Sequence, residues 1–138
     1  MNGYLLDTNI VSEARKEQRT NPNVRRWFES IQDETLFLSV LVLGEIRKGI
    51  EQARSRDIPK ARALERWLNT LENTYADRIL DVTIPIVDQW GRLSAMRPIS
   101  PVDGLMAATA LVHDLVFVTR NAADVVHTAA KVLNPFDL

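Results

Sequence analysis

Short apolar runs recur along this chain, and longer segments between them return to apolar residues every three or four positions. The short runs predict buried strands at residues 3–6, 35–40, 78–82 and 116–119, with 131–134 as a candidate fifth strand. Strands that alternate with helices favour a parallel sheet that is covered by helices on both faces.

The segments between the runs predict helices, and some of their starts carry a local signal. Asn21-Pro22 opens one helix, while Ser100 and Pro101 supply an N-cap and the first helical residue of another. Further helices are expected after Asp7, near Ser39, from about Pro59, and from Pro85 to about Met96. The predicted architecture is one three-layer α/β/α domain over residues 1–138, with a central, mostly parallel sheet of four or five strands.

Composition narrows the function classes. The 138 residues contain 46% hydrophobic residues, which is enough for a sizeable core, and 17 basic residues nearly balance 18 acidic ones. A globally basic footprint for nucleic acid is therefore absent, although local patches remain open. The lack of cysteine excludes disulfides and thiolate zinc sites. With no run near the roughly 20 apolar residues of a membrane span and no signal-peptide start, we expect no membrane partner and a cytoplasmic location.

Four acidic residues fall near the predicted strand ends, where ligands bind in open α/β sheets. Asp7 ends the first strand, Glu45 lies in the helix after the second, Asp103 begins the helix before the fourth, and Asp124 follows the fourth. Taken singly, each acid has an ordinary explanation. Asp7 could cap a helix, and Glu45 could pair with Lys48 on a helix surface. The charge at Asp103 suits the helix dipole, and Asp124 could be a loop or capping acid. Taken together, they predict one shared acidic rim.

A shared acidic rim needs a counter-charge. Two carboxylates 4 Å apart repel by roughly 4 kcal/mol at an effective dielectric of 20. A hard divalent cation removes this penalty, and oxygen-only ligands suit Mg²⁺, with Mn²⁺ as a substitute. Such an ion can orient a phosphate and activate water, so phosphodiester chemistry is expected. Polar residues flank the same rim and are expected to hold waters or the carboxylates: Thr8, Asn9, Thr119 and Asn121.

An ordered set of motifs resembles the PIN-domain ribonucleases, especially VapC-type toxins of toxin–antitoxin pairs and their FitB-like relatives. The set comprises "LLDTN", Ser12-Glu13, Ser39, Glu45, Gly49, "DGLMAATAL" and "VTRNAAD", and the likeness extends to "NPF" at residues 134–136. The resemblance implies that four family acids bind Mg²⁺ or Mn²⁺ at Asp7, Glu45, Asp103 and Asp124, with polar neighbours at Thr8, Asn9, Thr119 and Asn121.

Two departures from the family pattern concern the later acids. Val102 and Gly104 flank Asp103, where many relatives have alanine on one or both sides. Val125 follows Asp124, where many relatives have phenylalanine. These differences make Asp124 the least firmly matched of the four acids.

The resemblance also implies an activity and its partners. It implies a metal-dependent endoribonuclease that cuts RNA, commonly a structured RNA such as tRNA, by in-line attack of activated water that leaves a 5′-phosphate. Translation and growth would stop until a VapB-like antitoxin neutralises the toxin. A homodimer is expected, with promoter DNA bound only through the antitoxin. Arg120, beside the rim, is the nearest candidate for a substrate phosphate.

Several alternatives stay open at this stage. The basic residues between Arg47 and Arg66 are either an RNA-tracking surface or an ordinary solvated face. The three tryptophans are expected in the core, and the two histidines in structural or surface positions. An acid-cluster phosphatase of the haloacid dehalogenase type needs a second aspartate where Asn9 stands, and a receiver domain needs lysine where Arg120 stands. A catalytically inactive PIN-like binding scaffold is the non-enzymatic alternative.

Overall fold

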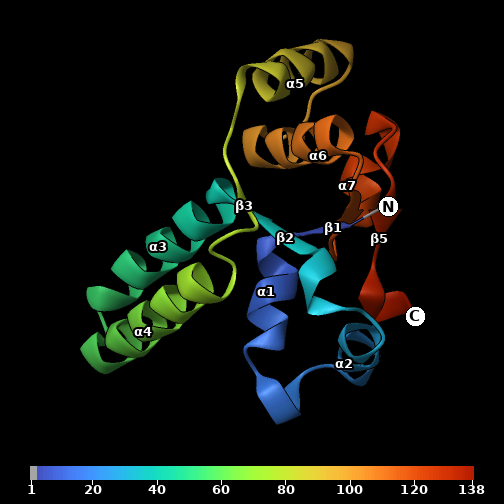
Figure 1. The fold of residues 1–138 in the computed structure, drawn as a ribbon. Coiled ribbons are helices and arrows are strands. Elements are labelled where there is room, and N and C mark those ends of the chain that lie inside the picture. Colours follow the sequence, from blue (N-terminus) through green and yellow to red (C-terminus); the bar gives the residue numbers. More distant parts are fainter. Residues whose placement is uncertain (1–2) are drawn as a thin grey trace.

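The central sheet confirms the predicted parallel α/β architecture. The computed structural model describes residues 3–138, in which five strands lie in the order β3-β2-β1-β4-β5, every neighbouring pair parallel (Figure 1). The strands are β1 Tyr4–Leu6, β2 Leu36–Ser39, β3 Ile79–Leu80, β4 Val116–Val118 and β5 Val132–Leu133. All five predicted strands are therefore present, and each is shorter than the sequence range that predicted it.

The six predicted helices are present in the predicted order. They are α1 Thr8–Ala14, α2 Pro22–Glu29, α3 Val40–Arg54, α4 Ile58–Thr74, α5 Ile84–Met96 and α6 Pro101–His113. A short further helix that was not predicted, α7 Ala122–Val125, follows β4. Short 3₁₀ turns include η1 at Glu17–Arg19 and η3 at Val126–Thr128. Side chains cap the predicted starts, since Asn21 accepts from two backbone N–H groups of α2 and Ser100 from that of Asp103.

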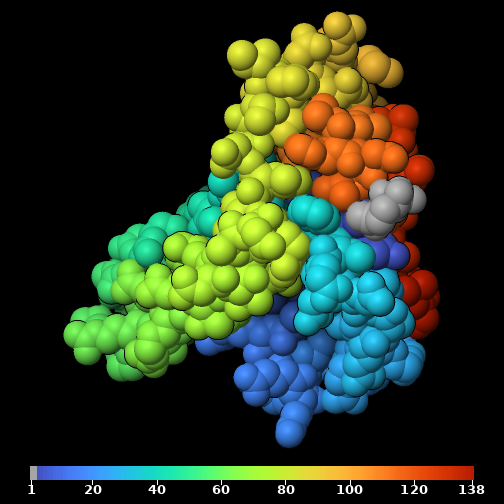
Figure 2. Space-filling view, in the orientation of Figure 1, coloured from blue at the N-terminus to red at the C-terminus, as the bar shows by residue number. Residues whose placement is uncertain are grey.

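The helices form layers on the two sides of the sheet. α5 and α6 lie together on one side, whereas α1, α2 and the α3–α4 pair lie on the other (Figure 1). The α3–α4 pair projects from the body as an arm (Figure 2). Helix α6 buries Met106 and Ala110 against the sheet core, and Ala107 and Ala108 in a second core with α5.

The central strand, β1, determines where the candidate site lies. β1 lies between β2 and β4, with Leu5 and Leu6 fully buried, so the residue after Leu6 emerges at the middle of the sheet's carboxyl edge. Parallel pairing brings the ends of β2 and β4 to that same edge. Within residues 3–138, the structure holds no helix whose length and apolar character would let it cross a membrane.

Candidate functional site

Asp7 stands at the carboxyl end of β1 and is buried, with 6% of its surface exposed. Its Oδ1 accepts from the backbone N–H of Thr8 at 2.8 Å. Its Oδ2 accepts from Thr119 Oγ1 at 2.7 Å and from Asn9 Nδ2 at 3.4 Å. Three donors from two strand ends therefore fix the orientation of a carboxylate that is largely removed from water.

The electrostatic surroundings of Asp7 oppose its charge. Burial raises the pKa of the Asp7 carboxyl, the hydrogen bonds from Thr119 and Thr8 lower it, and the nearby charges of Glu45 and Asp103 raise it, with a net upward shift. Asp7 thus lies within electrostatic reach of two other predicted site acids.

Glu45 faces the first helix. Its Oε1 accepts a short hydrogen bond from Thr8 Oγ1, so the residue next to Asp7 also orients the second acid. Within residues 3–138 Glu45 forms no ion pair with Lys48, the helix-surface partner that the spacing allowed. Asp7 and Glu45 are connected through a single threonine.

Asp103 and Asp124 line a common cavity of about 320 Å³. Ser100 Oγ donates to Asp103 Oδ2 at 2.9 Å, in addition to capping the helix. Arg97 and His127 line the same cavity. Arg97 was not predicted as a site residue, and His127 was expected in a structural or surface position. The position of Arg97 in the loop before Asp103 was the available signal.

The loop after β4 connects to the first helix through its polar residues. Thr119 Oγ1 accepts from the Asn121 backbone N–H at 3.1 Å, and Asn9 Oδ1 accepts from that of Arg120 at 3.2 Å. The Arg120 guanidinium lies 4.5 Å from the ring centroid of Phe136. This stacking holds an exposed cation beside the acidic edge, as a phosphate contact would require.

The four acids are brought to one edge in two groups. Asp7 and Glu45 are joined by Thr8, whereas Asp103 and Asp124 line a separate cavity. The charge of Asp103 reaches Asp7 and connects the two groups. As the side chains lie, no three His, Cys, Asp or Glu residues in the described chain are arranged to hold a metal ion. Metal ligation by the four acids therefore stays a prediction, and the structure supplies an all-oxygen donor set for it.

The basic residues of the middle of the chain divide into two sets. Arg47 and Arg54 pair with Glu51 and Glu65, with N···O distances of 2.6–3.4 Å. This network lies on a solvated face of the α3–α4 arm, and RNA contact by the basic residues stays a prediction. Arg56 and Lys60 instead line a cavity of about 300 Å³ that also contains Thr8 and Glu45.

Gly104 explains one departure from the family pattern. A Cβ at this position would lie 2.9 Å from Trp90 Cδ1 and 3.2 Å from both Trp90 Nε1 and Ile99 Cγ2. The indole of α5 therefore packs directly on the α6 backbone beside Asp103, where alanine has no room.

Gly104→Ala is expected to reduce the free energy of unfolding by about 1–3 kcal/mol, because Trp90 must move to admit the methyl group. Urea unfolding measures the change. The matched control is Gly91→Ala on α5, whose Cβ meets nothing within 4 Å, and which is expected to stabilise by roughly 0.5–1 kcal/mol. Equal effects of the two substitutions would contradict the packing argument.

Thr119→Val removes the hydroxyl that donates to Asp7, and we expect a loss of about 1–3 kcal/mol at neutral pH. The hydroxyl supports the ionised carboxylate, so its loss raises the pKa of Asp7 further. The deficit relative to wild type should therefore be largest above the folded pKa and shrink as pH falls below it. Unfolding curves at pH 4 and pH 8 test this, and a deficit that is independent of pH would contradict it.

Comparison with known proteins gives a consistent result. A family model described as the PIN domain matches residues 4–130. Toxin FitB of Neisseria gonorrhoeae is 30% identical over 138 residues, covering 96% of this chain and 97% of that protein. The VapC ribonuclease Y4jK of Sinorhizobium fredii is 27% identical over 142 residues, covering 96% and 97%. A crystal structure of FitAcB from Neisseria gonorrhoeae superposes with a TM-score of 0.86 at 29% identity, covering 98% of this chain and 99% of that one.

Proposed function

Because this chain belongs to the PIN-domain family, we propose that it is a metal-dependent endoribonuclease that acts as the toxin of a toxin–antitoxin pair. Relatives that align along almost their whole length are named as a toxin and as a VapC ribonuclease. The proposed substrate is a structured RNA such as tRNA, whose cleavage stops translation and growth.

One observation carries the proposal: a buried aspartate at the carboxyl end of the central strand faces two other acids. Burial raises the pKa of Asp7 most, and the charges of Glu45 and Asp103 raise it further. Within residues 3–138 none of the three acids forms an ion pair with lysine or arginine. A fold tolerates such repulsion where a ligand of opposite charge relieves it, and sites kept for function often cost stability in this way.

The donor set fits a hard divalent cation. The four acids offer carboxylate oxygens, and the burial of Asp7 together with its repulsion by Glu45 and Asp103 is the electrostatic condition that Mg²⁺ or Mn²⁺ would relieve. Asp7, Glu45 and Asp103 would hold the ion, and Asp124 would complete a further or weaker position. When bound, it would supply Lewis-acid polarisation of a phosphate oxygen and compensate the charge that develops in cleavage.

The residues of the chain prepare this site by orienting its carboxylates. Thr119 and the Thr8 backbone fix Asp7, the Thr8 hydroxyl fixes Glu45, and Ser100 fixes Asp103. Partners of this kind hold ligating carboxylates in place and raise their effectiveness. Arg120 beside Asn9 would bind a phosphate of the substrate and draw the RNA toward an otherwise acidic edge.

The proposed partner is an antitoxin protein. Solved relatives of this fold include FitAB bound to a DNA fragment, at 27% identity and a TM-score of 0.86. By analogy, an antitoxin would neutralise this chain, the complex would bind promoter DNA through the antitoxin, and the toxin would form a homodimer.

The direct test is to express the chain with and without Asp7→Asn and to map new 5′-phosphate ends across cellular RNA. The proposal predicts growth arrest and a small number of dominant cut sites for the wild type, both lost in the variant. Asp77→Asn, whose side chain is 83% exposed, serves as the control and should cut like the wild type. Wild-type expression without new ends, or identical ends in Asp7→Asn, would overturn the assignment.

A further inference from the structure

A cavity lies beside Glu45, between α1, α3 and α4. Its volume is about 300 Å³, and Thr8 and Glu45 of the candidate site form part of its wall. The helices of the arm supply its apolar wall residues: Ile46, Ala53, Leu64 and Trp67. Ligand sites have volumes of roughly 300–1,000 Å³, so this cavity has room for one nucleotide-sized group and not for a helix.

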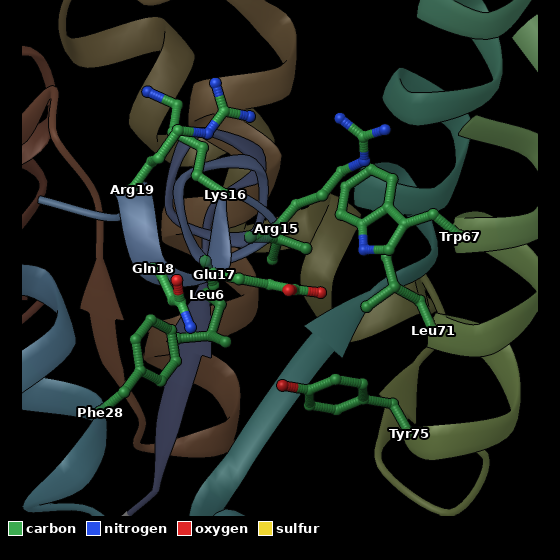
Figure 3. A pocket seen from close by; sticks show the side chains of 12 residues that line it. Leu6, Arg15, Lys16, Glu17, Gln18, Arg19, Phe28, Trp67, Leu71 and Tyr75 are labelled. Atoms are coloured by element: carbon green, nitrogen blue, oxygen red, sulfur yellow. The ribbon is translucent and has the colours of Figure 1, made fainter. Parts of the chain in front are cut away.

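Gly49 lines this cavity from the middle of α3, where neither the backbone nor the packing requires glycine. Its φ is not positive, and a Cβ at this position would meet no atom of the described chain within 4 Å. Glycine inside a helix is destabilising relative to alanine, because it loses more conformational freedom on folding. Gly44 and Gly91 are equally unhindered, but neither lines one of the three cavities described above and in Figure 3. The position of Gly49 therefore indicates that a ligand approaches the α3 backbone closely at this point.

Free positive charge stands at the rim of the cavity. Arg56 and Lys60 line it, are exposed, and form no ion pair within residues 3–138. Glu45 is the one acid among the lining residues. Unpaired cations of this kind bind the phosphates of a nucleic acid, which position the chain without reading its sequence.

Trp67 supplies an aromatic surface to the same cavity. It is partly exposed, and its indole also lines the larger cavity of about 760 Å³, where the Arg15 guanidinium lies 5.4 Å from the ring centroid (Figure 3). Every nucleobase has a π-face, so an accessible indole can stack on any base. The amide of Gln52, also on the wall, offers a donor and an acceptor to a base edge.

We propose that this cavity binds the base of a nucleotide next to the scissile phosphate, against Trp67 and over Gly49, while Arg56 and Lys60 bind the flanking phosphates. The inference rests on the proposed ribonuclease function and deepens it, because a base within a duplex cannot enter a cavity. Cleavage then requires an unpaired base beside the cut. A protein side chain would satisfy the apolar wall, but only a substrate nucleotide has to lie beside Glu45.

The test compares RNA with and without bases. Fluorescence anisotropy in EDTA measures the binding of a 12-nucleotide single-stranded RNA and of its fully abasic counterpart, which carries the same charge. The wild type should bind the RNA with bases at least about tenfold more tightly. Arg56→Gln/Lys60→Gln should weaken both RNAs by the same factor, because both contain the phosphates.

Gly49→Leu fills the cavity from α3 and should reduce the preference for bases at least about fivefold. Gly49→Ala adds only a methyl group and should change the preference in the same direction by less. The matched control is Gly44→Leu, on the same helix but outside the cavity, which should keep the preference. Urea unfolding should show all three variants at least as stable as the wild type, because leucine and alanine are better helix formers than glycine.

A wild type that binds the two RNAs equally would overturn the inference, as would Gly49 variants that keep the full preference. The RNA-end mapping gives an independent result for the nuclease, and dominant cuts within duplexes would also contradict the base subsite. A chain that cuts RNA but has no preference for bases loses only this subsite. A chain that prefers bases but never cuts loses the proposed activity.

Discussion

Asp7→Asn is expected to lower the rate of RNA cleavage by at least about 100-fold while leaving the metal-free protein as stable as the wild type, or more stable by about 1–2 kcal/mol. Activity falls because the amide is a neutral and weaker ligand at the centre of the proposed site. Stability is kept because the amide ends the repulsion by Glu45 and Asp103 and is cheaper to bury than a carboxylate.

The pH dependence of this effect follows from the raised pKa of Asp7. A carboxyl with a raised folded pKa favours the folded state below its unfolded pKa, and this contribution is lost as pH rises through the folded pKa. The gain from Asp7→Asn should therefore be present at pH 8 and diminish or vanish at pH 4. Urea unfolding at the two pH values measures it, with Asp77→Asn as a control that should show no such gain. A strongly destabilised Asp7→Asn protein at pH 8 would contradict the electrostatic account.

Mn²⁺ is expected to raise the melting temperature of the wild type by about 5–10 °C at an ion concentration 100 times the dissociation constant, where binding adds about 2.7 kcal/mol. The ion binds the folded chain because only folding brings Asp7, Glu45 and Asp103 to one edge. Melting curves with Mn²⁺ and with EDTA measure the shift. Asp103→Asn should reduce or abolish it, whereas Asp77→Asn should keep it. Identical curves for the wild type in both solutions would contradict the metal assignment.

Local signals predicted most of the fold. A short apolar run that ends in Asp7 marks a strand entering a helix, and Ser100-Pro101 marks a helix start, because capping and proline geometry act within a few residues. Alternation of strands and helices then favoured a parallel sheet. The lengths of the edge strands were harder to predict. The predicted strand covers 78–82, but β3 pairs over two residues, because strand length depends on the partner strand.

The sequence predicted which residues form the candidate site, but not which of them contact one another. The family resemblance and the strand ends selected Asp7, Glu45, Asp103 and Asp124, but no spacing rule shows that Thr8 joins the first two acids while a separate cavity holds the last two. The tryptophans divide in a similar way. Trp27 is buried as expected and Trp90 packs on Gly104, whereas Trp67 is partly exposed and lines two cavities. Such contacts join residues far apart in sequence and depend on tertiary packing.

The central claim is that acids from distant segments share one divalent cation at the carboxyl edge of the sheet. The most direct measurement is anomalous X-ray scattering from crystals of the wild type grown with Mn²⁺. The account predicts a manganese peak within coordinating distance of Asp7 and at least one of Glu45 and Asp103, and no such peak in Asp7→Asn crystals. A wild-type crystal whose manganese lies only elsewhere, or nowhere, would contradict it.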